Sequence, residues 1–129
     1  MNRYIAPKEV VCSFLDELHQ LIDAPYFNIK KNFQLGGKHE RKKNKDTMFE
    51  LNIDEGDIVQ ELRKLTISNY NHTLPDDRNT SMPDFHVFFI SNLCDKEIYV
   101  KVRIQKIEKI LCLSFHFAEF SHGKMPYLK

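Results

Sequence analysis

The last third of the chain alternates between apolar and polar residues with a period of two, and this pattern constrains the fold most strongly. Three segments carry it: residues 84–91, 97–105 and 110–117. Alternation of this kind is typical of strands with one buried face. The connections between the segments are too short for a crossover helix, so the sequence predicts an antiparallel meander of three strands over 84–117.

Helical patterns precede these strands. Apolar residues at spacings of three and four predict an amphipathic helix over 7–23. A second helix is expected over 54–66, with Asp54 as its N-cap, and a short helix over 47–51 follows Asp46. This order predicts an α+β fold, in which N-terminal helices pack on one face of a C-terminal antiparallel sheet.

The segments between these elements are predicted to be extended or irregular. Residues 27–33 alternate over a few positions and suggest a short strand or an extended arm. Residues 38–45 are expected to form a basic loop, and the turn-rich residues 70–83 a long loop. The length of 129 residues and the apolar content of 42% suit a single domain over 1–129.

The cysteines and the N-terminus bear on the compartment. Cys12, Cys94 and Cys112 are far apart in sequence and fit neither a disulfide framework nor a zinc spacing, so we expect three free thiols in a reducing compartment. The chain contains no apolar run long enough to span a membrane and does not begin with a secretory signal. A soluble, cytoplasmic protein without a membrane partner is therefore expected.

The hairpin between the last two predicted strands fixes which residues face each other. A turn near residues 106–109 places three pairs on the polar face of the sheet: Tyr99 with His116, Lys101 with Ser114, and Arg103 with Cys112. Two cations, a phenol and an imidazole gathered without a carboxylate would suit an anion such as a phosphodiester. The alternative is an ordinary solvent-facing sheet with mixed polar residues.

A second concentration of positive charge lies earlier in the chain. Residues 30–45 contain seven lysines and arginines and the single acid Glu40. Such a run is either a solvated loop or a surface that holds phosphates with little sequence preference. The candidate RNA-binding residues are Lys38, Arg41, Lys42, Lys43 and Lys45.

Several motifs in residues 40–129 resemble one known family. They are a basic run at 41–44, Leu-Thr at 65–66, Tyr70, Leu-Pro-Asp at 74–76, Lys-Glu-Ile-Tyr-Val-Lys at 96–101, Ser-Phe-His-Phe-Ala-Glu-Phe at 114–120, and Pro-Tyr at 126–127. In this order they resemble the MqsR-like toxins of type II toxin–antitoxin systems. The Tyr-x-Lys motif and the Ser-Phe-His motif are the most specific part of the match.

The resemblance implies a RelE-like α+β fold and cleavage of messenger RNA without metal or other cofactor. It also implies a cognate antitoxin that blocks the activity. Tyr99 and Lys101 match the strand motif of the family and His116 matches the Ser-Phe-His position. Lys64, just before Leu-Thr, is a looser match to a basic residue of the family.

The leading functional hypothesis is an endoribonuclease in which the 2′-hydroxyl of the RNA attacks the adjacent phosphorus. Lys101 and Arg103 would hold the phosphate, while Tyr99 and His116 would share the proton transfers, and the sequence leaves open which is base and which is acid. Tyr70 would either stack on an unpaired base or lie buried.

Two other classes of function remain open from the sequence. One is a non-catalytic module of the same fold that binds RNA or a protein on its polar face. The other is a metal site built from four histidines of the C-terminal half: His72, His86, His116 and His122. No short metal-binding spacing among them supports this alternative.

Overall fold

A computed structural model describes residues 2–93, 95–106 and 108–128. The helices are α1 (Lys8–Asp23), α2 (Ile29–Asn32), α3 (Arg41–Leu51) and α4 (Glu55–Lys64), followed by a 3-10 turn, η1 (Ile67–Asn69). The strands are β1 (Phe33–Leu35), β2 (Tyr70–Leu74), β3 (Phe85–Leu93), β4 (Lys96–Gln105) and β5 (Lys109–Phe117). Helices precede the main strands, which confirms the predicted α+β fold.

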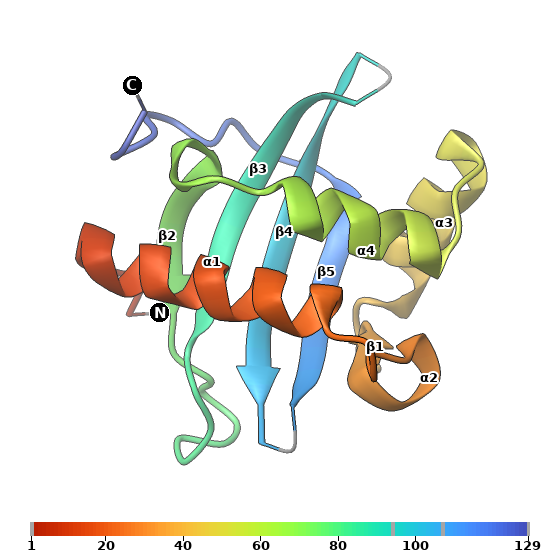
Figure 1. The fold of residues 1–129 in the computed structure, drawn as a ribbon. Coiled ribbons are helices and arrows are strands. Elements are labelled where there is room, and N and C mark those ends of the chain that lie inside the picture. The colour runs from red at the N-terminus through yellow and green to blue at the C-terminus, as the bar shows by residue number, and fades with distance from the viewer. Residues whose placement is uncertain (1, 94, 107, 129) are drawn as a thin grey trace.

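One sheet organises the molecule, with the strand order β1-β5-β4-β3-β2 (Figure 1). The predicted meander forms its centre, since β3, β4 and β5 are antiparallel neighbours. The sheet also has two outer strands. β1 pairs with β5 in parallel, so the sheet is mixed and not wholly antiparallel, and β1 includes Phe33 of the predicted extended arm.

The other outer strand, β2, corrects the predicted long loop. Residues 70–74 form a buried strand that pairs with β3, and only the residues after Leu74 form the connection to β3. The sequence of β2 contains Asn71, His72 and Thr73, which carry no apolar periodicity. The strand forms because neighbours satisfy its polar groups: Tyr4 and Thr73 exchange backbone hydrogen bonds of 3.0 and 2.8 Å.

The helices α1 and α4 lie together on one face of the sheet (Figure 1). Their apolar stripes, which include Leu18 and Leu62, are buried against core residues of the strands such as Phe88 and Phe115. Asp54 caps α4 with a reciprocal hydrogen-bond pair to Asp57. The predicted helices over 7–23 and 54–66 are thus confirmed, with ends that differ by one or two residues.

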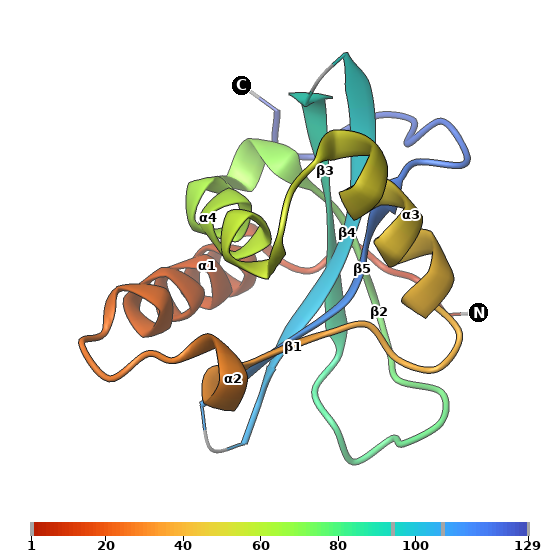
Figure 2. The same cartoon turned by 90° about the vertical axis from the view of Figure 1, so that its right-hand side faces the viewer.

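The predicted basic loop 38–45 and the separate helix 47–51 are wrong in one respect. Residues from Arg41 to Leu51 form one continuous helix, α3, and Asp46 lies inside it instead of capping it. Lysine and arginine are good helix formers, so a basic run does not prevent a helix. α3 lies beside β5, on the side of the sheet away from α1 and α4 (Figure 2).

The register of the β4–β5 hairpin follows the prediction over part of its length. Tyr99 pairs with His116 and Lys101 with Ser114, but a β-bulge follows and places Arg103 opposite Leu111. Cys112 therefore lies in the core and not on the polar face as predicted. The sequence does not indicate this bulge because residues 111–113 are all apolar or small, and either face accepts them.

Two further predictions concern cysteines and membranes. Cys12 and Cys112 carry free thiols, and burial raises the pKa of the Cys112 thiol; Cys94 lies outside the described residues. Among the helices of the described part of the chain, none combines the length and the apolar character needed to cross a bilayer.

Candidate active site

The face of the sheet opposite α1 and α4 is hollowed into a cavity of about 530 Å³. Side chains of β2, β3, β4 and β5 form its floor. The start of α3, the N-terminal segment and the segment after β5 form its walls. Of the predicted site residues, Tyr99, Lys101, His116 and Lys43 line this cavity.

Tyr99 and His116 form the centre of the floor. They are direct cross-strand neighbours, as predicted, and their rings stack with centroids 5.4 Å apart and an interplanar angle of 22°. Phe89 packs edge-on against Tyr99, with ring centroids 5.5 Å apart. Tyr99 is thus held between Phe89 and His116, which lowers the entropic cost of ordering the phenol around a substrate.

The hydrogen bond of His116 determines which ring nitrogen is free. Nδ1 of His116 lies 3.0 Å from the backbone oxygen of Phe117. A carbonyl oxygen only accepts, so Nδ1 is the donor and carries a proton. In the neutral ring Nε2 then holds a lone pair, and in the protonated ring it is a donor, which is the pair of states that acid–base catalysis requires.

Lys101 lies in the next row of the sheet, opposite Ser114. Its ammonium group is 4.9 Å from the ring centroid of Phe85. Burial lowers the pKa of Lys101 and raises the pKa of Tyr99. Tyr99 therefore keeps its phenolic proton at neutral pH and can donate a hydrogen bond, while a partly dehydrated ammonium gains from binding an anion.

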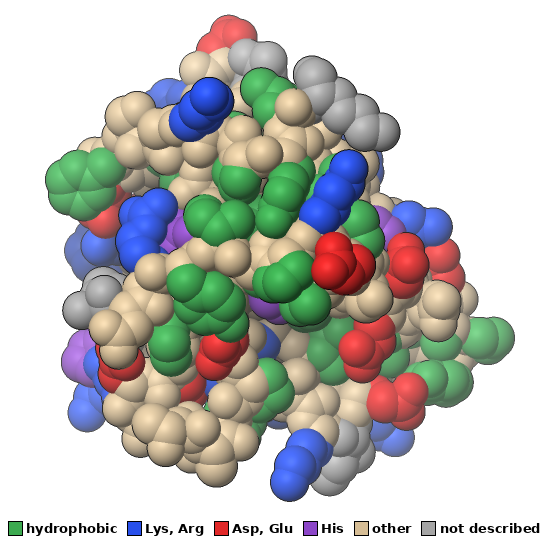
Figure 3. Space-filling model, turned by 90° about the vertical axis from the view of Figure 1, so that its left-hand side faces the viewer, with side chains coloured by type: hydrophobic (Ala, Val, Ile, Leu, Met, Phe, Trp, Pro, Cys, Tyr) green, Lys and Arg blue, Asp and Glu red, His purple; other side chains and the backbone are tan. Residues whose placement is uncertain are grey.

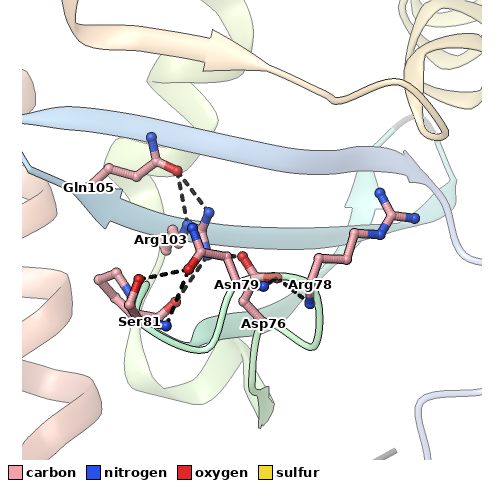
Figure 4. Close-up of polar contacts among 7 residues, drawn as sticks. Asp76, Arg78, Asn79, Ser81, Arg103 and Gln105 are labelled. Carbon is pink, nitrogen blue, oxygen red and sulfur yellow. Dashed lines mark hydrogen bonds and ion pairs between the residues drawn. The ribbon is translucent and has the colours of Figure 1, made fainter.

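Arg103 does not line this cavity, in contrast to its predicted role beside Lys101. Its Nη1 atom donates to Asp76 at 2.7 Å and to the backbone oxygen of Pro83 at 3.1 Å. The other guanidinium nitrogens donate to Gln105 at 3.0 and 2.9 Å (Figure 4). The group also stacks over Phe85. The guanidinium is therefore already neutralised and hydrogen-bonded.

The ion pair of Arg103 fastens the β2–β3 connection to the sheet. Arg103 lowers the pKa of the Asp76 carboxyl through their hydrogen bond. The same carboxylate accepts from the backbone nitrogens of Arg78 and Asn79, and Ser81 donates to Asn79 (Figure 4). We assign Arg103 a structural role on this evidence.

Lys64 also lies away from the cavity. It is at the end of α4, which covers the opposite face of the sheet, and its ammonium group pairs with Glu61 at 3.0 Å. The side chain is 72% exposed. Lys64, the looser match to the family, therefore lies apart from the three residues that match its strand motifs: Tyr99, Lys101 and His116.

The basic segment is divided among several surfaces because α3 is a helix. Lys43 faces the cavity and pairs with Glu119 at 2.9 Å. Arg41, Lys42 and Lys45 are exposed on α3, and Lys38 lines a smaller hollow next to Arg103 and Asp76.

Two buried polar residues attach α3 to the edge of the sheet. The amide of Asn44 donates to the Leu113 oxygen at 3.1 Å and accepts from the Phe115 nitrogen at 3.0 Å. Thr47 accepts from the Phe117 nitrogen at 3.2 Å. These side chains form hydrogen bonds with the backbone of β5 in the part that extends beyond β1. The hydrogen bonds hold the start of α3 at the mouth of the cavity.

A glycine allows this close approach. Gly36 follows β1 with a φ of +76°, a left-handed conformation that favours glycine. A Cβ atom there would lie 2.8 Å from the Asn44 amide nitrogen. A side chain at this position would therefore displace the Asn44 amide, which joins α3 to β5.

The N-terminal segment forms the wall on the β2 side. The Tyr4 hydroxyl donates to Asp84 at 2.6 Å, and this hydrogen bond raises the pKa of Tyr4 to about 12. Arg3 donates to the side chain of Asn71 at 3.3 Å and lines the cavity. Sequence reasoning did not identify Arg3 because nothing in the sequence predicts that residues 2–5 return to the sheet.

His72 also lines the cavity, although the sequence suggested it only for the alternative metal site. It lies on β2, which was expected to be a loop, and its side chain is buried on the floor of the cavity. Seen from the β2 side, histidine side chains are recessed between hydrophobic and basic ones (Figure 3). Tyr70, by contrast, is fully buried and bonded to Thr73 and Ala6, which excludes it as a base-stacking platform.

The charges around the cavity are more balanced than the sequence suggested. Arg3, Lys43 and Lys101 are opposed by Glu40 and Glu119. Glu119 is bound to Lys43, whose hydrogen bond lowers the pKa of that carboxyl. Lys101 thus remains as the cation of the floor that makes no ion pair with a described residue.

The four histidines of the alternative metal hypothesis do not converge. His86 faces α1 on the opposite side of the sheet, where it packs against Phe14 with ring centroids 4.6 Å apart. Among the residues that the structure describes, no group of three or more His, Cys, Asp or Glu side chains is arranged to hold a metal ion.

The chain matches no protein-family model and no curated protein.

Proposed function

We propose that this protein is the toxin of a type II toxin–antitoxin system, an MqsR-like endoribonuclease that cleaves messenger RNA in the cytoplasm without a metal cofactor. One observation carries the proposal: Tyr99, Lys101 and His116 line a single cavity on the side of the sheet away from α1 and α4. These are the residues that match the two most specific motifs of the resemblance.

The reaction is a transfer within the RNA. The 2′-oxygen loses its proton and bonds to the adjacent phosphorus, the bond from phosphorus to the 5′-oxygen breaks, and the leaving oxygen gains a proton. The products are a 2′,3′-cyclic phosphate and a 5′-hydroxyl. Lys101 holds the phosphate, Tyr99 donates a hydrogen bond to it, and His116 takes part in proton transfer. Each preorganised donor contributes about 3 kcal/mol to the transition state.

The exposed cations of α3 hold the flanking phosphates of the substrate. Arg41, Lys42 and Lys45 lie on the helix whose first turn borders the cavity. Phosphate contacts position an RNA strand without selecting its sequence. The same surface attracts the acidic segment of a cognate antitoxin, which neutralises the toxin by covering the cavity.

Induced expression in growing bacterial cells tests the proposal. The unaltered chain is expected to stop growth and to produce transcripts that end in 2′,3′-cyclic phosphates. The Tyr99→Phe variant, which lacks only the hydroxyl, is expected to permit growth at the same expression level. Normal growth with intact transcripts on expression of the unaltered chain would refute the toxin proposal. RNA binding without cleavage by the purified chain would favour the non-catalytic module instead.

A further inference from the structure

His72 occupies a defined place in the cavity floor. The pairings His72 with Val87, Val87 with Lys101, and Lys101 with Ser114 form one row across the sheet. Neighbouring strands lie about 4.8 Å apart, so His72 is roughly 10 Å from Lys101 along this row at the level of the backbone. His116 lies on the far side of Lys101, one row away on β5. At the level of the backbone, the two histidines therefore lie on opposite sides of Lys101.

A β-bulge in β2 orients the imidazole of His72. The pairing shifts between Tyr70 and His72, which makes Asn71 an extra residue beside the histidine on the cavity side. The amide nitrogen of Asn71 donates to the His122 backbone oxygen at 3.1 Å, so its amide oxygen accepts from His72 Nδ1 at 2.7 Å.

His72 and His116 thus have the same arrangement. Each donates a hydrogen bond from Nδ1, His72 to Asn71 and His116 to Phe117. Neither Nε2 atom bonds to a residue that the structure describes, and neither is sealed away from solvent. Each imidazole consequently has one fixed nitrogen and one nitrogen that can exchange a proton with a ligand in the cavity.

We propose that His72 is the general base and His116 the general acid for cleavage of a phosphodiester held by Lys101. This inference rests on the ribonuclease function proposed above. His72 Nε2 takes the proton of the 2′-hydroxyl while the 2′-oxygen bonds to phosphorus. As the bond to the 5′-oxygen breaks, His116 Nε2 donates its proton to that oxygen. Attacking and leaving oxygens lie on opposite sides of phosphorus in an in-line displacement, as do the two histidines around Lys101.

The surroundings of His72 keep its imidazole neutral at pH 7. Burial lowers the pKa of His72 to about 4, and the nearby cations Arg3 and Lys101 add to the effect. His72 is therefore neutral at pH 7, the state of a base. The other charged or titratable side chains of the cavity walls lie just before α3, in its first turn and on the segment after β5: His39, Glu40, Lys43, Glu119 and His122.

The test compares two RNA substrates that differ at the scissile bond. One is a short RNA containing a cleavage site mapped with the unaltered protein, and the other has sulfur in place of the 5′-oxygen. A thiolate leaves without being protonated, so the sulfur substrate needs a base but no acid. His72→Asn is chosen because the shorter amide preserves the hydrogen bond to Asn71 and lacks Nε2.

We expect His72→Asn to slow cleavage of both substrates by roughly 100-fold or more. His116→Ala should slow cleavage of the ordinary RNA to a similar extent. It should cleave the sulfur substrate at a rate within about tenfold of that of the unaltered protein. The matched control is His86→Asn, which changes a buried histidine on the other side of the sheet whose Nδ1 bonds to Thr73. It should cleave both substrates at the normal rates.

Other results would overturn the assignment. If folded His72→Asn cleaves within threefold of normal, or if sulfur restores cleavage to His72→Asn and not to His116→Ala, His72 is not the base. If His72→Asn does not fold, His72→Gln replaces it, with the same expectations. If the unaltered protein cleaves no RNA, the ribonuclease proposal fails, and this inference fails with it. If the unaltered protein and the His72 variant both cleave RNA at similar rates, only the role of His72 is refuted.

Discussion

Lys101 and Arg103 are two residues apart on the same strand and face the same side of the sheet, yet their surroundings differ. Arg103 is buried in an ion pair with Asp76 and bonded to Gln105. Lys101 lines the main cavity and makes no ion pair with a described residue. The difference comes from the β2–β3 connection, which places its carboxylate over Arg103.

This comparison shows that a cation on the polar face of a sheet can serve either stability or ligand binding. A buried charge whose partner is removed is strongly destabilising, because it stays dehydrated without compensation. A half-buried cation without a carboxylate partner is instead stabilised when an anion binds. The same substitution should therefore lower the stability of the protein at Arg103 and its activity at Lys101.

The largest expected effect is on stability. Arg103→Met removes the guanidinium and leaves the Asp76 carboxylate without its partner, so the free energy of unfolding should fall by about 3 kcal/mol. Chemical denaturation of the unaltered protein and the variant measures this difference. A fall below 0.5 kcal/mol would contradict a structural role for Arg103.

The matched substitution Lys101→Met should have a comparable effect on activity and little effect on stability. Loss of the ammonium group should lower kcat/KM for RNA cleavage by about 100-fold, since a positioned charge in the transition state contributes about 3 kcal/mol. The thermal midpoint should stay within a few degrees. An active Lys101→Met variant would remove this residue from the site.

A smaller effect is expected from the exposed cations of α3. Changing Arg41, Lys42 and Lys45 to Gln should weaken binding of single-stranded RNA roughly tenfold at physiological salt. The slope of log affinity against log salt should become shallower by about 0.7 for each lost phosphate contact. Replacing Lys30 and Lys31 on α2 is the control and should not change the slope. Equal effects of both sets would indicate attraction by net charge alone.

The ion pair of Arg103 should also make stability depend on pH in a defined direction. The folded-state pKa of Asp76 is lowered, so its stabilisation is present above the unfolded-state pKa near 4 and is lost as pH falls through the folded-state value. The stability gap between the unaltered protein and Asp76→Asn should narrow in acid. Urea unfolding at pH 7 and at pH 3 measures the gap, and a constant gap would contradict the pairing.

The smallest effect is predicted for Lys64. Although the resemblance implies a catalytic role, Lys64 ends α4, which covers the opposite face of the sheet (Figure 1), and its side chain is exposed. Lys64→Ala should cleave RNA within about threefold of the normal rate, a change that corresponds to less than 1 kcal/mol. A 100-fold loss would mean that α4 contributes to catalysis.

The sequence predicted the central part of the site because two local rules determine it. Period-two alternation places Tyr99 and His116 on one face, and a short hairpin sets their pairing. Beyond Lys101 the register changes at a bulge, and Cys112 moves to the core. The bulge adds one residue to an apolar run, which leaves no trace in the pattern of hydrophobicity.

The elements around this central part were not predictable in this way. Asn44, Thr47 and His72 are polar residues without periodicity, and they occupy regular elements only because distant backbone groups or side chains satisfy them. Local propensity carries no information on such partners, since tertiary contacts override it. The pairing of Arg103 with Asp76 was missed for the same reason, because Asp76 follows a strand that was expected to be a loop.

The central claim is that the floor of this cavity cleaves RNA by acid–base chemistry without a metal ion. The most direct measurement is the single-turnover cleavage of single-stranded RNA in excess chelator by the unaltered protein and by His116→Ala, with analysis of the product ends. We predict 2′,3′-cyclic phosphate ends and a rate at least about 100-fold lower for the variant, which should keep its thermal midpoint within a few degrees. No cleavage by the unaltered protein, cleavage only after a divalent ion is added, or equal rates for the two proteins would contradict the claim.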